Sequence, residues 1–294
     1  MMLIALTLIF CMTYSLVFAF DYVNKNVVNM HAQPDDLSEV ISQAIYATPI
    51  ECLEERGSWC CIQTPDLYRG WVEKNAVISR EQLYLEGQRC AQVHSLFGHL
   101  FRVNDTTPHA PLVTLPFGAK VEVVTGYNNE QRWVQVRLLD GQIAWMQRGD
   151  LQVDPQPITL KEMMALSQRF LGLPYTWGGV STFGFDCSGY VQMLYGQMGI
   201  LLPRDSYLQA EAKGGVAIEL KNLEEGDLLF FGPNQKKINH VGIYLADNKF
   251  IHAKAKITRG SPTVQISDLL SPNYDETLVC VRRFLKDEGG KDEG

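Results

Sequence analysis

Short runs in which hydrophobic and polar residues alternate fill most of the chain between residues 27 and 153. This is the pattern of β-strands that bury one face. Runs such as VVNMHAQP and SWCCIQTP are separated by turn residues. A similar series runs from Leu112 to Leu151 and contains Asp140-Gly141 between alternating hydrophobic residues, a strong β-hairpin signal. We therefore predict two small all-β barrels, at residues 21–80 and 103–153.

The two series resemble each other as an internal repeat. In each, one tryptophan precedes a strand (Trp59 and Trp133) and another follows a turn that contains glycine (Trp71 and Trp145). The pattern indicates one small barrel used twice. Between the barrels, residues 81–102 contain the run EQLYLEGQRCAQVHSLFG, which predicts a partly helical connector.

The hydrophobic period changes after a proline-containing linker at residues 154–158. Thr159 and Glu162 match a capping box at the start of a helix, and hydrophobic residues then recur at helical spacing. A second helical pattern follows Cys187, and the later runs DLLFFG, HVGIYLA, KFIHAK, TVQI and LVCVRRFL predict strands. We therefore predict an α+β domain at residues 159–286, followed by a charged, disordered tail at residues 287–294.

The first 20 residues carry no charged side chain and are mostly hydrophobic. Their length fits the hydrophobic segment of a signal peptide and is borderline for a membrane span. Ala19 offers a cleavage point ahead of Phe20, whereas the absence of Lys and Arg in this leader argues against a signal peptide. We expect export, with residues 1–20 as a signal peptide and a membrane anchor as the alternative. The expected location is the periplasm or cell envelope, with the cytoplasm as the alternative.

Composition narrows the classes of partner and cofactor. The formal net charge is −7, the pI is about 5.4 and no basic stripe with interleaved aromatic residues occurs, so nucleic acid is not an expected partner. None of the seven cysteines forms a C-x-x-C pair, so we expect no structural zinc site and no cofactor. In an exported chain disulfides can form among Cys52, Cys60, Cys61 and Cys90, and the sequence leaves their pairing open.

The run FDCSGY joins a glycine-rich segment to the second helical pattern. Asp186 stands where an N-cap residue is expected and Cys187 where the helix begins. Free backbone N–H groups and the helix dipole would lower the pKa of a cysteine there and would hold an oxyanion. Gly189 would let a substrate backbone approach closely. Cys187 is therefore a candidate nucleophile, although a single cysteine at a helix start more commonly only packs.

Two of the six histidines, His240 and His252, lie in one predicted hairpin, HVGIYLADNKFIH. A three-residue loop at residues 246–248 would set Gly242 opposite His252 and make the two histidines diagonal neighbours on one face. A two-residue loop would put them on opposite faces. In the first register His240 can serve as the base for Cys187, with His252 orienting it. One cysteine and two histidines could also bind zinc, but no fourth ligand has suitable spacing.

Several motifs occur in an order and spacing that resemble the NlpC-type family of cell-wall cysteine peptidases. They are Tyr175-x-Trp177-Gly-Gly, Asp186-Cys187-Ser188-Gly189, PRDSYLQ, GDLLFFG and HVGIYLADNKFIHA, within residues 159–285. The resemblance implies a papain-like α+β fold and a triad of Cys187, His240 and His252. It also implies hydrolysis of peptidoglycan stem peptides, commonly between D-γ-glutamate and the diamino acid. Tyr175 would lie near the oxyanion, and the other candidates for oxyanion or substrate binding are Trp177, Asp186, Ser188 and Ser206.

The two predicted barrels resemble the bacterial SH3-like domains that often precede this catalytic domain. In that subgroup the first barrel closes one end of the cleft and supplies a tyrosine and an acid. With an acid of the catalytic domain, these hold the free α-amine of L-alanine. The catalytic-domain acid matches Asp205, and the barrel tyrosine matches Tyr68. For the barrel acid we choose Glu39, with Asp66 as the alternative; ordinary turn and surface roles are the competing interpretation for Tyr68 and Glu39.

We therefore expect a cysteine endopeptidase that acts on peptidoglycan stem peptides with a free N-terminal L-Ala. One alternative keeps the triad but cuts between the sugar and L-alanine, as an N-acetylmuramoyl-L-alanine amidase. Another is a non-catalytic cell-wall-binding protein, against which the intact Cys187, His240 and His252 argue. A further interpretation makes the barrels spacers without a part in the site.

Overall fold

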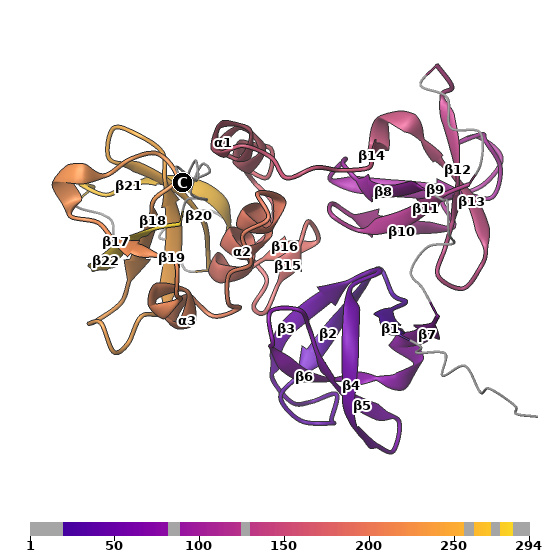
Figure 1. Ribbon diagram of the computed structural model, residues 1–294, viewed down its shortest axis with the longest axis horizontal. Coiled ribbons are helices and arrows are strands. Elements are labelled where there is room, and N and C mark those ends of the chain that lie inside the picture. The colour runs from indigo at the N-terminus through magenta and orange to yellow at the C-terminus, as the bar shows by residue number, and fades with distance from the viewer. Residues whose placement is uncertain (1–19, 82–88, 125–129, 256–261, 272–276, 285–294) are drawn as a thin grey trace, which may run out of the picture.

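The structure is a computed structural model that describes residues 20–81, 89–124, 130–255, 262–271 and 277–284. Figure 1 shows two all-strand bodies on one side of the molecule and a mixed body of helices and strands on the other. We call these the first barrel (residues 20–80), the second barrel (residues 89–153) and the α+β domain (residues 159–284). The predicted α+β class, with two small barrels ahead of the α+β domain, is confirmed.

The first barrel is a seven-stranded antiparallel sheet with the strand order β3-β2-β6-β5-β4-β1-β7. Alternate residues of its strands point into a small core that contains Met30, Ala44, Ile62 and Val72. Its elements are β1 Phe20–Val23, β2 Val27–His31, β3 Val40–Ile45, β4 Pro49–Arg56, β5 Trp59–Gln63, β6 Arg69–Glu73, the 3-10 turn η1 Lys74–Ala76 and β7 Val77–Arg80.

The second barrel repeats the first strand for strand. Its order, β10-β9-β13-β12-β11-β8-β14, is that of the first barrel with each strand number raised by seven. Trp59 and Trp133 begin the equivalent strands β5 and β12, and Trp71 and Trp145 lie in the equivalent strands β6 and β13. The predicted internal repeat is therefore confirmed. The elements of the second barrel are β8 Arg89–Val93, β9 Phe97–Phe101, β10 Val113–Pro116, β11 Lys120–Val123, β12 Trp133–Arg137, β13 Ile143–Gln147, the 3-10 turn η2 Arg148–Asp150 and β14 Leu151–Val153.

The prediction of a partly helical connector over residues 81–102 is wrong for its described part. Residues 89–93 and 97–101 are the strands β8 and β9, so the second barrel starts at Arg89 rather than at residue 103. Gln and Ala favour helices, but helix propensity contributes little energy per residue, and pairing with β11 and β10 overrides it. Gly98 fits this pairing because a Cβ there would lie 2.7 Å from Val93 and 2.8 Å from Met146.

The α+β domain packs its helices against one face of a six-stranded antiparallel sheet with the order β17-β22-β18-β19-β20-β21. The predicted capping box is present, because the Thr159 side chain accepts from the backbone of Glu162 and the Glu162 side chain accepts from that of Thr159. The elements of the α+β domain are α1 Leu160–Gln168, β15 Val180–Ser181, β16 Gly184–Phe185, α2 Cys187–Gln197, α3 Ser206–Glu211, β17 Val216–Ala217, the 3-10 turn η3 Leu220–Asn222, β18 Leu228–Phe231, β19 His240–Tyr244, β20 Lys249–Lys254, β21 Thr263–Asp268 and β22 Leu278–Arg283.

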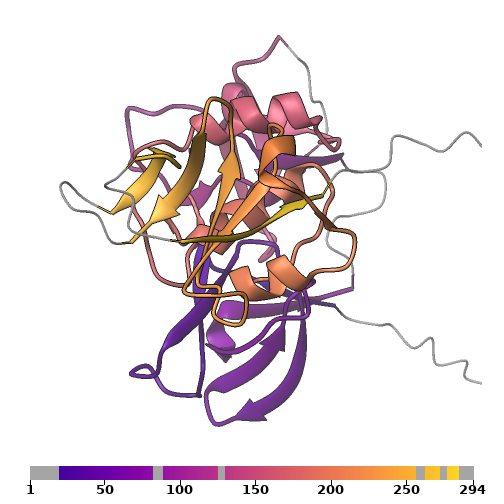
Figure 2. The ribbon, with the colours of Figure 1, turned by 90° about the vertical axis from the view of Figure 1, so that its left-hand side faces the viewer.

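Helix α2 lies between the six-stranded sheet and the two barrels, and Figure 2 shows the sheet with the first barrel beneath it. The second barrel joins the core of the α+β domain through Phe117, which is buried and contacts the Phe170 ring edge-on. The two barrels meet where the Tyr46 hydroxyl accepts a hydrogen bond from the backbone N–H of Leu139 at 2.5 Å. This packing contradicts the interpretation of the barrels as spacers.

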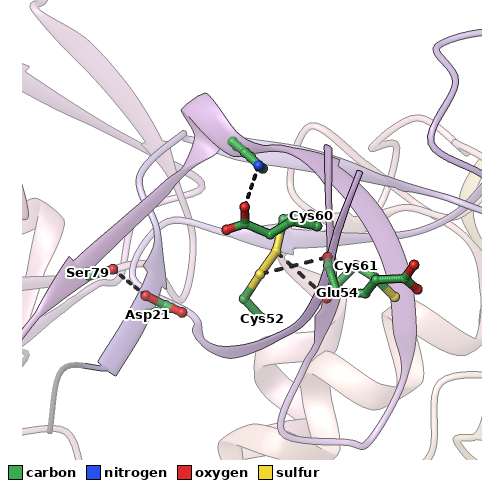
Figure 3. The surroundings of a disulfide bond; sticks show 8 residues. Asp21, Cys52, Glu54, Cys60, Cys61 and Ser79 are labelled. Carbon is green, nitrogen blue, oxygen red and sulfur yellow. Dashed lines mark hydrogen bonds and ion pairs between the residues drawn. A yellow bond between two sulfur atoms is a disulfide. The ribbon is translucent and has the colours of Figure 1, made fainter. Parts of the chain in front are cut away.

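One disulfide joins Cys52 to Cys60 across the β4–β5 hairpin of the first barrel, with a Cα–Cα distance of 6.2 Å (Figure 3). Cys61, next in the chain, keeps a free thiol, as does Cys90. The structure therefore selects one pair from the four cysteines that the sequence left open.

Residues 1–19, which carry the predicted leader, and residues 285–294, which carry the predicted tail, lie outside the described residues. Phe20 is already the first residue of β1 and pairs with Arg80 of β7. Within the described segments, no helix has the length and apolar character needed to span a membrane.

Replacing both Cys52 and Cys60 by serine is expected to lower the free energy of unfolding of the first barrel. The bond spans a sequence separation of 8 residues, and closing so short a loop contributes about 2–3 kcal/mol through the unfolded chain. Urea titration followed by tryptophan fluorescence measures the change, with Cys61→Ser as the control because Cys61 lies outside the bond. Equal urea midpoints for the double variant and the control would contradict the prediction.

Candidate active site

Cys187 is the first residue of helix α2, at the place where the helix meets the six-stranded sheet. Asp186 is the N-cap, and its side chain accepts a hydrogen bond from the backbone N–H of Gly189 at 2.7 Å. The backbone N–H groups of Ser188 and of Val241 lie close enough to the Cys187 thiol to lower its pKa. Val241 directly follows His240, so the thiol lies against the strand that carries the first candidate histidine.

The expected effect of the helix start on Cys187 is reversed by burial. Burial, and next the negative charge of Asp186, raise the pKa of the Cys187 thiol to about 12, against the lowering by its two backbone donors and by Arg204. The prediction of a lowered pKa is therefore wrong for this state of the protein. At neutral pH the thiol keeps its proton, and a nucleophilic Cys187 needs a neighbouring base to take it.

Glycines let the segment before Cys187 pack onto the first turn of α2. A Cβ at Gly189 would lie 2.2 Å from the Gly179 carbonyl oxygen, and one at Gly179 would lie 2.3 Å from the Gly184 carbonyl oxygen. The backbone that approaches Gly189 is thus the protein's own, not that of a substrate as the sequence suggested. The backbone N–H of Asp186 donates to the Gly179 carbonyl at 3.0 Å and ties the two segments together.

The hairpin β19–β20 has the register that brings the two histidines together. Ile243 pairs with Ile251, which sets Gly242 opposite His252, and the loop between the strands is formed by residues 246–248. His240 Nε2 lies 2.6 Å from His252 Nδ1, and the ring centroids are 4.8 Å apart. The three-residue loop predicted from the sequence is confirmed. Asp247 and Asn248 make it possible by adopting positive φ values of 49° and 60°.

His252 is fully buried and stays neutral. Burial, and then the charges of His240 and Lys254, hold the pKa of His252 well below its usual range. Its second nitrogen, Nε2, lies 2.9 Å from the Ser267 Oγ on β21. Both ring nitrogens of His252 are therefore in hydrogen bonds, which argues against the zinc alternative. The described residues also hold no group of three His, Cys, Asp or Glu side chains arranged to bind a metal.

Arg204 is a buried residue with several polar partners that the sequence did not reveal, because only Asp205 and Ser206 of the PRDS motif were candidates. The Arg204 side chain is 2% exposed and pairs with both carboxylate oxygens of Asp186. It also donates to the Ser188 hydroxyl at 3.0 Å and to the Ser42 hydroxyl of the first barrel at 2.9 Å. Asp186 and Ser188, which we had considered for substrate binding, are therefore engaged in holding α2 against the barrel.

Tyr68 and Asp205 meet across the junction between the first barrel and the α+β domain. The Tyr68 hydroxyl donates to Asp205 Oδ1 at 3.4 Å, and the neighbouring Tyr207 also interacts with this carboxylate. Burial raises the pKa of Asp205, although Arg204 and Tyr68 act in the opposite direction. Asp205 is thus a half-buried carboxylate for which a cationic partner would be favourable.

The two candidate barrel acids contact different parts of the α+β domain. Glu39 accepts a hydrogen bond from Trp177 Nε1 at 3.1 Å. Asp66 accepts one from Gln192 Nε2 of α2 at 2.8 Å, and its charge acts on Asp205.

The remaining candidates lie on the segments that surround Cys187. Tyr175 forms a parallel bridge with Phe185 and packs against the core of the α+β domain. Ser206 is buried at the first position of α3. Trp177 is 63% exposed, so a ligand can reach it.

Comparisons with known proteins agree with this arrangement. The family model described as "NlpC/P60 family" matches residues 172–283, and the model described as "Bacterial SH3 domain" matches residues 26–78. A gamma-D-glutamyl-L-lysine dipeptidyl-peptidase of Bacillus cereus is 30% identical over 260 residues, which are 83% of this chain and 75% of the relative. The protein of the same name from Bacillus subtilis is 28% identical over 258 residues, 84% of this chain and 81% of the relative. The crystal structure of a Bacillus cereus protein of the NlpC/P60 family matches the fold with a TM-score of 0.76 at 23% identity, covering 91% of this chain and 100% of that one.

Replacing Arg204 by alanine is expected to destabilise the protein strongly. The change leaves the buried Asp186 carboxylate without its partner, which costs about 3–5 kcal/mol. The control is Arg89→Ala, because the pair of Arg89 with Asp154 is about half exposed (49% and 46%). Such an exposed pair contributes about 0–1 kcal/mol. Urea unfolding of both variants tests the difference, and equal midpoints would contradict it.

Proposed function

Since the chain belongs to the NlpC/P60 family, we propose that it hydrolyses the bond between D-γ-glutamate and the diamino acid in peptidoglycan stem peptides with a free N-terminal L-alanine. The protein is a cysteine peptidase. The names of the two Bacillus relatives, gamma-D-glutamyl-L-lysine dipeptidyl-peptidases, describe cleavage at a bond of this kind and support the proposal.

In the proposed reaction Cys187 is the nucleophile and His240 the base. His240 takes the thiol proton as the sulfur attacks the carbonyl carbon of the γ-glutamyl bond. The oxyanion forms beside the N-terminus of α2 and near Tyr175, where backbone donors stabilise it. When the intermediate collapses, the C–N bond breaks and the amine of the diamino acid leaves with the proton from His240. Water, deprotonated by His240, then attacks the thioester carbonyl, the C–S bond breaks, the Cys187 sulfur regains the proton from His240, and L-alanyl-D-glutamate is released.

The Tyr68–Asp205 contact carries the proposed preference for a free amine. An ammonium group placed between these residues would compensate the charge of a half-buried carboxylate. An acylated nitrogen, such as that of a stem peptide still attached to its sugar, brings no positive charge to compensate the Asp205 carboxylate. The site therefore favours peptides that have already been cut from the glycan, and Glu39 and Trp177 are proposed to border the same end of the cleft.

We propose the cell envelope or periplasm as the location. The Cys52–Cys60 disulfide supports an oxidising compartment, and the uncharged leader at residues 1–20 supports export. Peptidoglycan peptides are the proposed partners there, with a tether through the leader as an additional proposal.

Incubation with L-Ala-γ-D-Glu-diaminopimelate is expected to release diaminopimelate from the wild-type protein and none above background from Cys187→Ala, since the nucleophile is lost. Mass spectrometry of the products measures both. The control is Cys61→Ser, whose thiol lies in the first barrel and outside the proposed reaction. Release by Cys187→Ala at the wild-type rate would contradict the assigned nucleophile. Cleavage of intact muropeptides without cleavage of the tripeptide would instead support the amidase.

Acetylating the N-terminal amine of the same tripeptide is expected to lower kcat/KM by about 10- to 100-fold. Leaving a fully buried charge unpaired costs about 3–5 kcal/mol, and the partial exposure of Asp205 reduces that cost. In Asp205→Asn the two peptides should be cleaved at similar, low rates, because the charge that distinguishes them is gone. Asp140→Asn, in an exposed turn of the second barrel, is the matched control. Equal kcat/KM for both peptides with the wild-type protein would overturn the amine preference.

A further inference from the structure

Three polar side chains lie in a line across the adjacent strands β19, β20 and β21. Gly242 of β19 and Gln265 of β21 are the residues directly opposite His252 of β20. His240 is displaced by two residues from Gly242, and Ser267 by two residues from Gln265. Both are thus diagonal neighbours of His252, at the separation that lets longer side chains meet. His252 is therefore bonded from two sides, by His240 and by Ser267.

A neutral, buried imidazole carries its single proton on one of two nitrogens, and its partners decide which one. If the proton is on His252 Nδ1, that nitrogen donates to His240 Nε2. The proton of a neutral His240 is then on Nδ1, and neither of its nitrogens is free to accept another. If the proton is on His252 Nε2, Nδ1 accepts from the Nε2–H of His240, and His240 Nδ1 keeps its lone pair. Only the second arrangement gives His240 the capacity to take the proton of Cys187.

The second arrangement requires an acceptor for the Nε2–H of His252. The ring is fully buried, so bulk water does not reach it. The Ser267 oxygen stands 2.9 Å from Nε2 and supplies it. A hydroxyl is suited to the position, because its oxygen accepts while its own proton turns to another partner.

We propose that Ser267 is a positioning residue for the reaction: its hydroxyl oxygen accepts the Nε2–H hydrogen bond of His252 and so keeps His240 in the tautomer that acts as a base. This proposal rests on the proposed function, in which His240 takes the thiol proton. Ser267 touches neither the thiol nor the substrate, and acts through His252 and His240 in turn.

The same contact also orients His252 while His240 carries a positive charge. After proton transfer the imidazolium of His240 donates from Nε2 to His252 Nδ1, and the His252 ring is polarised toward Ser267. Phe250 packs against His252 with a centroid distance of 4.6 Å and limits the ring's rotation from the side. Charged groups near His252 are His240 on β19 and Lys254 on β20, and both disfavour protonation of His252 itself.

The test compares Ser267→Ala with Ser267→Thr, which restores a hydroxyl. Ile266→Thr is the control, because Ile266 is the neighbouring residue of β21, points to the other face and is 41% exposed. We expect Ser267→Ala to lower kcat on the tripeptide about 10- to 100-fold with KM within about twofold of wild type, since the change acts on the chemical step alone. Ser267→Thr should recover most of kcat, and Ile266→Thr should match the wild type.

Two further measurements test the role of Ser267 without depending on which substrate the enzyme cleaves. The rate at which iodoacetamide alkylates Cys187, followed by mass spectrometry of the peptide that contains it, reports removal of the thiol proton without any peptide substrate. It should fall in Ser267→Ala and recover in Ser267→Thr. Two-bond 1H–15N spectra of the histidine rings, assigned with His252→Ala, should show the proton of wild-type His252 on Nε2.

Each outcome of these experiments either supports or overturns the proposed role of Ser267. If the tripeptide is not cleaved but the alkylation rates and the ring spectra behave as described, the substrate is wrong and the role of Ser267 stands. A proton on Nδ1 of His252 in the wild-type protein would overturn the proposal, even if Ser267→Ala fails to fold. Equal kcat and equal alkylation rates for Ser267→Ala and the wild type would overturn it as well.

Discussion

The buried ion pair between Arg204 and Asp186 is the contact on which the rest of the site depends. Removing both charges from water is costly, and the structure compensates by giving the guanidinium the carboxylate and two hydroxyl partners. Asp186 is at once the N-cap of the helix that starts with Cys187 and the anion for Arg204. Arg204 in turn reaches Ser42 of the first barrel. One pair thus sets the position of the candidate nucleophile relative to the barrel.

This arrangement links recognition to chemistry through neighbouring residues. Asp205 follows Arg204 in the chain and meets Tyr68 of the first barrel, whereas Cys187 follows Asp186. The distance between the proposed amine site and the nucleophile is therefore governed by one rigid contact rather than by two independent loops. A substrate held at Asp205 would have its reacting bond placed at a fixed distance from the group that Asp205 holds.

The two barrels have the same strand order but different tasks. The first contributes Tyr68, Glu39 and Ser42 to the junction with the α+β domain, and its β4–β5 hairpin is closed by a disulfide. The second barrel contributes Phe117 to the core of the α+β domain. Its Gln92 side chain donates a hydrogen bond to Gln197 of α2 at 2.7 Å. A repeated fold has thus been used once to border the site and once to support the helix behind it.

Local patterns in the sequence were sufficient wherever neighbours in the chain decide the structure. Alternation predicted the strands of the barrels, the tryptophan pairs predicted the repeat, and Thr159 with Glu162 predicted a helix start. The hairpin register that joins His240 to His252 was also accessible, because it depends only on the length of one loop. The strands β8 and β9 were missed because their helix-favouring residues are paired with distant strands.

The features that required the folded protein involve groups far apart in the chain and the water that folding removes from them. The pKa of Cys187 was expected to fall at a helix start, yet burial raises it, and no local pattern reports burial of that thiol. Arg204 bonding Ser42 and Ser267 bonding His252 likewise require the barrel and the strand β21 to be in place. The order of residues alone was enough to identify the candidates for the chemistry. The packing of separate elements determined their protonation, their orientation and the groups they contact, because those properties depend on dielectric and distance rather than on order in the chain.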